Sequence, residues 1–190
     1  IVIVADDLTG ANDTAAAFAR HGFRAATLLR LQDAARLGAL GCEVVAVSTE
    51  SRGLSALEAR RVVSRLFETY RPGPHDIVYK KIDSALRGNW VAELDALMES
   101  CGRFQRVGVA PAFPAMGRTT VGGIQRIDGV PVHLTEMGRD PVSPVRISSI
   151  PALLERQWPG KVACLPLARV RRGAAAVTQW LSTLAPGVRA

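Results

Sequence analysis

Short apolar runs alternate along this chain with longer stretches of helical spacing. The runs are rich in β-branched residues and bounded by polar or turn-forming residues, which is typical of buried strands in a parallel sheet. They cover residues 1–5, 25–29, 44–49, 77–82, 107–110 and 162–167. The helical patterns cover residues 54–70, 90–101, 150–158 and 173–184. This order predicts a three-layer αβα fold of the α/β class, with helices on both faces of a doubly wound, mostly parallel sheet.

The first apolar run leads into a helical pattern through two aspartates, Asp6 and Asp7. We expect Thr9 to cap the helix, residues 10–19 to form it and Gly22 to mark its end. The two aspartates would then lie at the carboxyl end of a strand, beside a helix N-terminus. Ligands bind at such places in open α/β sheets. The alternative is that either aspartate only caps the helix.

One segment departs from the alternating pattern. Asp128 and Gly129 stand between two short apolar runs within residues 122–134, a strong signal for a hairpin turn. We therefore expect a small β-hairpin excursion from the α/β core. The chain also begins on a core strand at Ile1, and it stops after the helix at 173–184, where the pattern calls for another strand. We expect a sequence that is trimmed at its beginning and lacks a C-terminal portion.

Length and composition are those of one ordinary globular domain. The chain has 190 residues, of which 48% are hydrophobic and 22% charged, so we expect a single domain over residues 1–190. The net charge of +7 permits nucleic-acid binding, but it also suits a pocket for anions. The densest basic cluster is Arg169, Arg171 and Arg172, with no neighbouring aromatics to stack on bases. We therefore expect no nucleic-acid partner.

Cysteine spacing and hydropathy exclude further classes. Cys42, Cys101 and Cys164 are odd in number, far apart and not paired with histidines at metal-ligand spacing. They indicate neither a disulfide framework nor a metal site, and we expect buried, reduced thiols. No stretch approaches the roughly 20 apolar residues that cross a bilayer, and no signal segment is visible. We therefore expect a cytoplasmic protein with no membrane partner.

Four loops that follow predicted strands are rich in side chains that bind hydroxyls and anions. They cover residues 5–10 (ADDLTG), 48–52 (STESR), 79–89 (YKKIDSALRGN) and 111–123 (PAFPAMGRTTVGG). Because the carboxyl ends of parallel strands share one edge of a sheet, these loops can converge. We expect the side chains of Asp7, Arg52, Lys81 and Asp83 to meet there in one pocket, with the hairpin outside the main core.

The residue types in these loops suit a small hydroxylated acid. Asp7 and Asp83 can accept hydrogen bonds from hydroxyl groups, and Arg52 and Lys81 can neutralise a carboxylate. Ser84 adds a neutral hydroxyl. An aspartate at such a site could also take a hydroxyl proton during phosphoryl transfer. The sequence has neither a GxGxxG fingerprint after a strand nor a GxxxxGK[ST] loop, so a nucleotide site is expected elsewhere.

Structural roles compete with these assignments. Lys80 and Lys81 are neighbours on a strand and must point to opposite faces, so at least one is expected to be structural or solvated. Residues 87–89 could form only a turn and a helix cap, and residues 118–120 only an exposed loop. The histidines and serines show no nucleophile motif, which disfavours hydrolysis by an activated serine.

Taken together and in order, five motifs resemble those of the four-carbon acid sugar kinase family. They are ADDLTGANDTA, TESR, YKKIDSALRGN, APAFPAMGRTTVGG and GVPVHLTEMGRDPVSPV, and the match runs from Val2 to about Ile150. The resemblance implies an ATP-dependent kinase acting on acids such as threonate, erythronate or 3-oxo-tetronate. Such kinases have an N-terminal acid-sugar-binding domain and a C-terminal nucleotide-binding domain, and this chain resembles the first of these.

By the same resemblance, the substrate would be bound by Asp7, Arg52, Lys81, Asp83 and Ser84. We add Arg87 as a further substrate-binding candidate and expect Asp7 to be the catalytic base, with Asp83 as the alternative. ATP and Mg²⁺ would be bound mainly by the absent C-terminal domain, so we expect the fragment alone to be inactive. The partners implied are the sugar acid and that missing domain, and the sequence leaves a homo-oligomer open. One departure is Ala85, where the family usually has Thr; a hydroxyl is lost beside the expected pocket.

Two other functions remain open from the sequence. A Mg²⁺-dependent, phosphatase-like hydrolase could use Asp6 or Asp7 as its nucleophile, because the pair follows a strand. The chain could also be a basic, anion-binding module without enzymatic activity.

Overall fold

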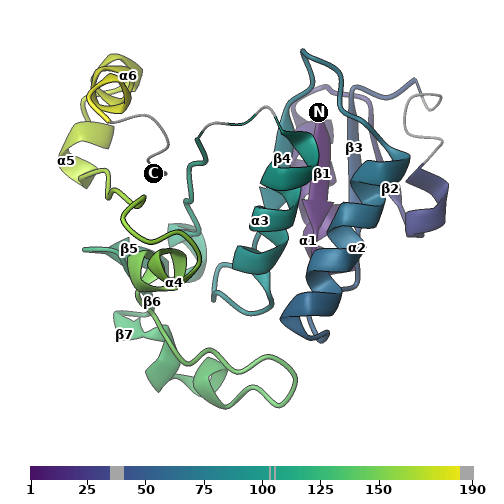
Figure 1. Ribbon diagram of the computed structural model, residues 1–190. Coiled ribbons are helices and arrows are strands. Elements are labelled where there is room, and N and C mark those ends of the chain that lie inside the picture. The colour runs from purple at the N-terminus through teal and green to yellow at the C-terminus, as the bar shows by residue number, and fades with distance from the viewer. Residues whose placement is uncertain (35–40, 103, 105, 185–190) are drawn as a thin grey trace. The chain divides into compact units, whose positions relative to one another are not determined.

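The structure is a computed structural model that describes residues 1–34, 41–102, 104 and 106–184 (Figure 1). The chain divides into two compact units, whereas its length leads us to expect one domain. The α/β unit comprises residues 1–102 and 141–143, and the hairpin unit comprises residues 103–140 and 144–190.

Four parallel strands form the sheet of the α/β unit, in the order β2-β3-β1-β4. They are β1 (Val2–Ala5), β2 (Ala25–Leu28), β3 (Val44–Ser48) and β4 (Val78–Lys81). The helices of this unit are α1 (Leu8–Arg20), α2 (Ala56–Thr69) and α3 (Trp90–Cys101). The crossovers β1-α1-β2 and β3-α2-β4 run in opposite directions across the sheet. Because such crossovers are right-handed, α1 and α2 cover opposite faces.

Burial along β1 shows that both faces of the sheet are covered. Ile3 and Ala5 lie in a core cluster with alanines of α1. Val2 and Val4 point to the other face and are only 4% and 0% exposed. That face belongs to α2 and α3, which pack against one another (Figure 1). The predicted α/β class and mostly parallel sheet are therefore confirmed.

The hairpin unit contains an antiparallel sheet in the order β5-β6-β7. Its strands are β5 (Arg118–Val121), β6 (Ile124–Ile127) and β7 (Val130–Pro131), and its helices are α4 (Ile150–Gln157), α5 (Leu167–Val170) and α6 (Ala174–Ser182). Asp128 and Gly129 connect β6 to β7 with φ of 48° and 82°, the left-handed values of a type I′ turn. The hairpin predicted from these two residues is confirmed.

Two predicted strands do not form in the described part of the chain. Residues 107–110 contain no strand, and residues 162–167 contain one isolated bridge position, at Val162, before α5 begins. Pro111 directly follows the first run and Pro166 lies within the second, and a proline has no N–H to give to a neighbouring strand. An apolar run alone therefore does not predict a strand here, because a strand also needs a neighbouring strand to which its backbone can hydrogen-bond.

The expectation of buried thiols is wrong. Cys42 and Cys101 are half-buried and Cys164 is exposed. Cys42 precedes β3 and Cys101 is the last residue of α3, so both lie at element ends that solvent reaches.

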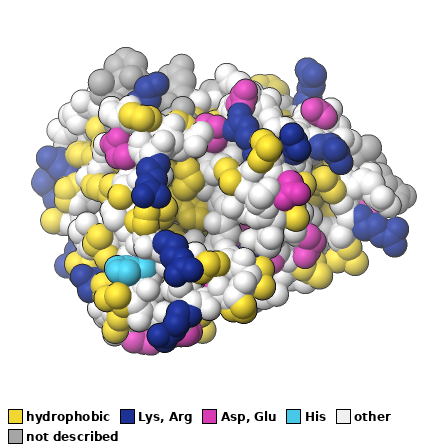
Figure 2. Space-filling view, turned by 60° about the horizontal axis from the view of Figure 1, so that its bottom comes forward, with side chains coloured by type: hydrophobic (Ala, Val, Ile, Leu, Met, Phe, Trp, Pro, Cys, Tyr) yellow, Lys and Arg dark blue, Asp and Glu magenta, His cyan; other side chains and the backbone are white. Residues whose placement is uncertain are grey.

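One face of the molecule shows how its basic side chains are distributed. On the face drawn in Figure 2, Lys and Arg side chains stand among hydrophobic and acidic ones without merging into one basic patch. Within the described ranges, no helix combines the length and the apolar character that a membrane crossing needs.

Candidate functional site

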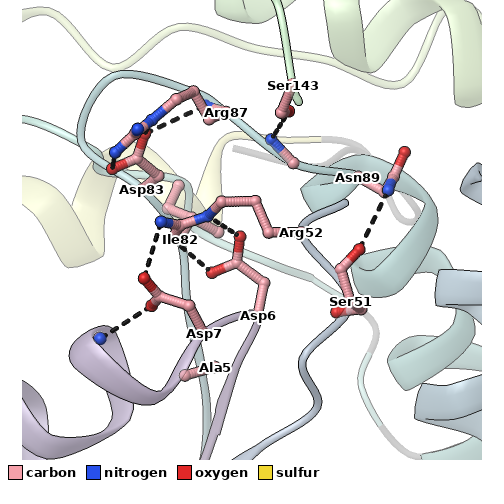
Figure 3. A network of polar contacts seen from close by, with 12 residues as sticks. Ala5, Asp6, Asp7, Ser51, Arg52, Ile82, Asp83, Arg87, Asn89 and Ser143 are labelled. Atoms are coloured by element: carbon pink, nitrogen blue, oxygen red, sulfur yellow. Dashed lines mark hydrogen bonds and ion pairs between the residues drawn. The ribbon is translucent and has the colours of Figure 1, made fainter. Parts of the chain in front are cut away.

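Strand register brings three of the loops singled out in the sequence to one edge of the sheet. Ala5, the last residue of β1, pairs with Ser48 at the end of β3 and with Lys81 at the end of β4. The chain therefore leaves all three strands at the same level. The charged residues at and after these strand ends form what we call the strand-end cluster: Asp6, Asp7, Arg52, Lys81, Asp83 and Arg87. Figure 3 labels all of them except Lys81.

Arg52 lies at the centre of this cluster and contacts both opening aspartates. Its Nε and Nη2 donate to Asp6 Oδ2 and Oδ1 at 2.8 and 3.0 Å, a two-point geometry. Its Nη1 lies 2.7 Å from Asp7 Oδ2. Asp6 is only 2% exposed, so its charge depends on this pairing. Arg52 thus neutralises carboxylates of the protein itself, and its contact with a substrate carboxylate stays a prediction.

The charge of Arg52 is strongly held by these neighbours. Burial acts to lower the pKa of the guanidinium, but the hydrogen bond and charge of Asp6 and the charges of Asp7 and Asp83 outweigh it. The net effect is a pKa of Arg52 above its ordinary value. Arg52 is therefore a permanent cation that joins the ends of β1 and β3.

Asp7 both caps a helix and contacts Arg52. Its Oδ1 accepts a hydrogen bond from the backbone N–H of Gly10 at 2.8 Å, which makes Asp7 the N-cap of α1. The expectation that Thr9 would be the cap is wrong, because α1 begins at Leu8 and Thr9 lies within its first turn. The capping role weighed for the aspartates is thus real for Asp7. It leaves Oδ2 directed at Arg52.

Asp83 and Arg87 form a second pair in the loop after β4. Arg87 Nε donates to Asp83 Oδ2 at 2.8 Å, and the backbone N–H of Arg87 reaches the same oxygen at 3.3 Å. Burial acts to raise the pKa of Asp83, but the hydrogen bond and charge of Arg87, with the charge of Arg52, hold it below its usual range. Asp83 is therefore a stable carboxylate at neutral pH.

The two adjacent lysines have separate environments, as strand geometry requires. Lys81 shares the face of Ala5 and lies beside α1, since a Cβ added to Gly10 would come within 3.4 Å of Lys81 Cγ. Its Nζ donates to the carbonyl of Ile82 at 2.7 Å. Lys80 points to the other face, where it pairs with Glu93. The ion pairs among the described residues engage Arg52 and Arg87 with carboxylates, but not Lys81.

Gly88 and Ser143 complete this edge of the unit, and the sequence did not single them out for the site. The N–H of Gly88 donates to Ser143 Oγ at 2.6 Å. Gly88 has φ of 85°, and a Cβ there would lie 2.7 Å from Asp6 Oδ2. A glycine is therefore required for the loop to pass so close to the buried carboxylate. The signal available in the sequence was the glycine itself, between Arg87 and Asn89.

The remaining loop residues are placed as follows. Ser84 is half-buried and Ala85 is 2% exposed, both in the loop after β4. Asn89 makes no side-chain cap bond to α3; its Nδ2 donates instead to the carbonyl of Leu54 at 2.8 Å. The loop at 111–123 follows no strand and lies in the hairpin unit, where it forms a 3₁₀ turn and β5.

Taken over the described residues, no group of three His, Cys, Asp or Glu side chains is placed to hold a metal ion. The strand-end cluster holds three carboxylates and three cations, which compensate one another in charge. Such a cluster offers both acceptors for hydroxyls and donors for a carboxylate.

Comparison with known proteins points to one family. A model of the family described as sugar-binding N-terminal domain matches residues 1–189. A D-erythronate kinase of Heliobacterium modesticaldum is 36% identical over 95% of this chain and 41% of its own length. A D-threonate kinase of Bordetella bronchiseptica is 44% identical over 81% of this chain and 38% of its own length. The chain therefore spans about two fifths of the length of these curated relatives.

Solved structures of similar chains share the fold. A Bordetella bronchiseptica protein described as a domain of unknown function, with bound citrate and as a domain-swapped dimer, is 37% identical with a TM-score of 0.80. The match covers 97% of this chain and 46% of that one. A Haemophilus influenzae protein at 23% identity and a TM-score of 0.78, covering 96% and 44% of the two chains, supports the fold alone.

Proposed function

The chain belongs to the family of sugar-binding N-terminal domains, and from that premise we propose that it is the substrate-binding part of an ATP-dependent kinase for a four-carbon sugar acid. The resemblance drawn from the sequence motifs is thereby confirmed at the level of the family. Relatives named D-erythronate, D-threonate and 3-oxo-tetronate kinase support the substrate class. The observation that carries the proposal is the strand-end cluster, which lies where open α/β sheets bind ligands.

Lys81 is the group best placed to receive the carboxylate of the acid. Arg52 and Arg87 already contact carboxylates of the protein, whereas Lys81 Nζ contacts a neutral backbone carbonyl. An ammonium group that meets only a carbonyl gains most from an incoming anion. The citrate bound by the Bordetella relative is consistent with a site for small carboxylic acids. Arg52 would then act mainly by holding the aspartates.

The hydroxyl groups of the acid would meet the carboxylates. Each carboxylate oxygen has two lone pairs, so Asp7 and Asp83 can accept hydrogen bonds from a substrate while keeping their present contacts. Ser84, in the same loop as Asp83, would contribute a further hydroxyl contact. The site residues proposed for the substrate are Asp7, Arg52, Lys81, Asp83, Ser84 and Arg87.

Of the two aspartates, Asp7 is the better candidate for the base that takes the proton of the attacking hydroxyl. A proton acceptor works best when its pKa lies near the working pH. The pKa of Asp83 is held below its usual range by Arg87 and Arg52, which makes Asp83 a weak base. Asp83 would instead orient a hydroxyl that does not react.

ATP and Mg²⁺ would be held mainly by a nucleotide-binding domain that this chain does not contain. The described residues provide no three-ligand acidic group, and the sequence provides no phosphate-cradling glycine loop. When bound, ATP with its metal supplies the phosphoryl group and neutralises its charge. We expect the 190-residue chain by itself to bind the acid but to transfer no phosphate.

The geometry gives less support to the hydrolase alternative. A nucleophilic aspartate needs an accessible oxygen, but Asp6 is 2% exposed and both of its oxygens contact Arg52. Asp7 is engaged by the first turn of α1 and by Arg52. A non-enzymatic anion-binding module is retained as an outcome of the test below.

The proposal is tested with the full-length protein that carries this chain, assayed with ATP, Mg²⁺ and a panel of D-threonate, D-erythronate and 3-oxo-tetronate. ADP release with at least one acid is expected. The variant Lys81→Gln should raise KM about tenfold to a hundredfold, as loss of a charged hydrogen bond does. Lys161→Gln, at an exposed position, is the matched control and should leave KM unchanged. Binding of these acids without turnover would favour the non-enzymatic module.

A further inference from the structure

Lys80 and Glu93 form an ion pair that is buried inside the α/β unit, on the face of the sheet opposite Lys81. Lys80 Nζ lies 2.9 Å from Glu93 Oε2, and the two side chains are 4% and 0% exposed. Removing two charges from water carries a large desolvation cost, so a pair of this kind is weak evidence for a purely stabilising role. The further contacts of Glu93 indicate a role beyond stability.

The second oxygen of Glu93 connects the pair to the loop after β3. Glu93 Oε1 accepts a hydrogen bond from the hydroxyl of Ser51, which is fully buried. Ser51 Oγ also lies 2.7 Å from Thr49 Oγ1. The hydroxyl of Thr49 donates to the carbonyl of Ala5 at 2.8 Å. A continuous chain of polar contacts therefore runs from β4 through α3 to the ends of β3 and β1.

The backbone around Ser51 is held at the same time. The N–H groups of Ser51 and Arg52 donate to the carbonyl of Asp6 at 3.0 and 3.3 Å. Asn89 Nδ2 donates to the carbonyl of Ser51 at 3.4 Å (Figure 3). It also donates to the carbonyl of Leu54 at 2.8 Å. The residue that follows this fixed point is Arg52, whose guanidinium organises the strand-end cluster. The direction of its side chain thus depends on how Ser51 is held.

We propose that Lys80 and Glu93, acting through Ser51, are positioning residues that aim Arg52 at the two opening aspartates. Both side chains lie on the face of the sheet opposite Lys81, away from the proposed substrate contacts. The inference rests on the proposed function only for its effect on the sugar acid. A displacement of about 1 Å at a binding group can cost about a hundredfold in rate, so a loose Arg52 would weaken the site without any loss of direct contacts.

A purely structural role would be to hold β4 against α3, and two kinds of variant separate it from positioning. Replacing a buried ion pair by apolar residues of similar volume is often neutral or stabilising. The double variant Lys80→Met with Glu93→Leu should therefore keep the fold but lose the contact to Ser51. Ser51→Ala removes the same contact from the other side.

The test measures KM and kcat for the four-carbon acid, and urea unfolding, in the full-length protein. Ser51→Ala and the double variant should each lower kcat/KM about tenfold or more, although the double variant stays as stable as the wild type. Glu99→Gln is the matched control: Glu99 lies on the same helix, is 68% exposed and pairs with Arg60. It should change kcat/KM less than twofold. Wild-type kcat/KM in the stable double variant would overturn the proposal.

A second measurement needs no ligand. A double-mutant cycle with Asp6→Asn and Arg52→Gln, read by urea unfolding, gives the coupling between these side chains. In the Ser51→Ala background the coupling should fall by half or more, and an unchanged coupling would overturn the positioning role. If the wild-type protein acts on no four-carbon acid, the proposed function fails. The coupling energy between Asp6 and Arg52 still decides whether Ser51 positions Arg52.

Discussion

Arg52 contacts Asp6 through two hydrogen bonds, from Nε to Oδ2 at 2.8 Å and from Nη2 to Oδ1 at 3.0 Å. Asp6 follows β1 and Arg52 follows β3, so this pair ties two neighbouring strands together beyond the sheet. Asp6 is only 2% exposed. A buried carboxylate is costly without a partner, so the buried charge of Asp6 requires Arg52.

Arg52→Ala is expected to destabilise the protein as well as weaken binding. Removing the arginine leaves the Asp6 carboxylate buried without its partner, which typically costs about 3–5 kcal/mol. Urea unfolding measures the loss. Arg24→Ala is the control, because Arg24 and Glu43 form a pair whose side chains are 75% and 52% exposed, and such pairs contribute about 1 kcal/mol or less. Equal losses in the two variants would contradict the dependence of Asp6 on Arg52.

Gly88→Ala is expected to lower the unfolding free energy by more than the strain of a left-handed backbone conformation alone would. The new Cβ would lie 2.7 Å from Asp6 Oδ2, an atom that Arg52 holds in place. Gly22→Ala is matched to it, since Gly22 has φ of 89° but no atom within 4 Å of an added Cβ. Gly22→Ala should cost about 1–2 kcal/mol in unfolding free energy. Gly88→Ala should cost more and raise KM for the acid, and identical behaviour of the two would argue against close approach to Asp6.

Asp7→Asn separates catalysis from helix capping. The amide oxygen can still accept the hydrogen bond from Gly10, so α1 keeps its cap while the charge is lost. If Asp7 is the base, kcat should fall about 10²–10⁴-fold, by more than KM rises. Asp13→Asn, at an exposed position of α1, should leave both constants unchanged. Should Asp83→Asn abolish kcat while Asp7→Asn leaves it intact, the role of base passes to Asp83.

The pairing of Asp83 predicts a particular dependence of stability on pH. Because its folded pKa lies below its usual range, Asp83 contributes stability that is fully present above its unfolded pKa of about 4. That contribution is lost as the pH falls through the folded pKa. The difference in unfolding free energy between wild type and Asp83→Asn should thus be constant from neutral pH to about pH 5 and shrink below about pH 4. A difference that grows on acidification would refute the pairing with Arg87.

Much of the α/β unit follows from local sequence pattern. The β-branched runs at 1–5, 44–49 and 77–82 formed strands, and the rule that parallel strands end at one edge placed the three loops with Asp7, Arg52 and Asp83 at the same edge of the sheet. Strand alternation also separated Lys80 from Lys81. These features depend on patterns of hydrophobic and polar residues that repeat every few positions, and such patterns can be recognised in the sequence itself.

Partners across the fold could not be predicted in the same way. That Arg52 meets Asp6, or that Ser51 meets Glu93 at 42 residues' distance, depends on side-chain directions that only the packed loops define. Ser143 reaches Gly88 from 55 residues away, from a segment with no periodic pattern. The runs at 107–110 and 162–167 form no strand among the described residues, although their apolar pattern predicts one.

Binding of a four-carbon sugar acid at the strand-end cluster is tested most directly by nuclear magnetic resonance. Amide chemical shifts of the ¹⁵N-labelled chain are followed as D-threonate or D-erythronate is added, with Lys81→Gln as the control. The shifts are predicted to concentrate in residues 5–10, 51–54 and 81–88 and to need a much higher acid concentration in Lys81→Gln. No shift at any acid concentration, or shifts confined to the hairpin unit, would contradict a sugar-acid site at the ends of β1, β3 and β4.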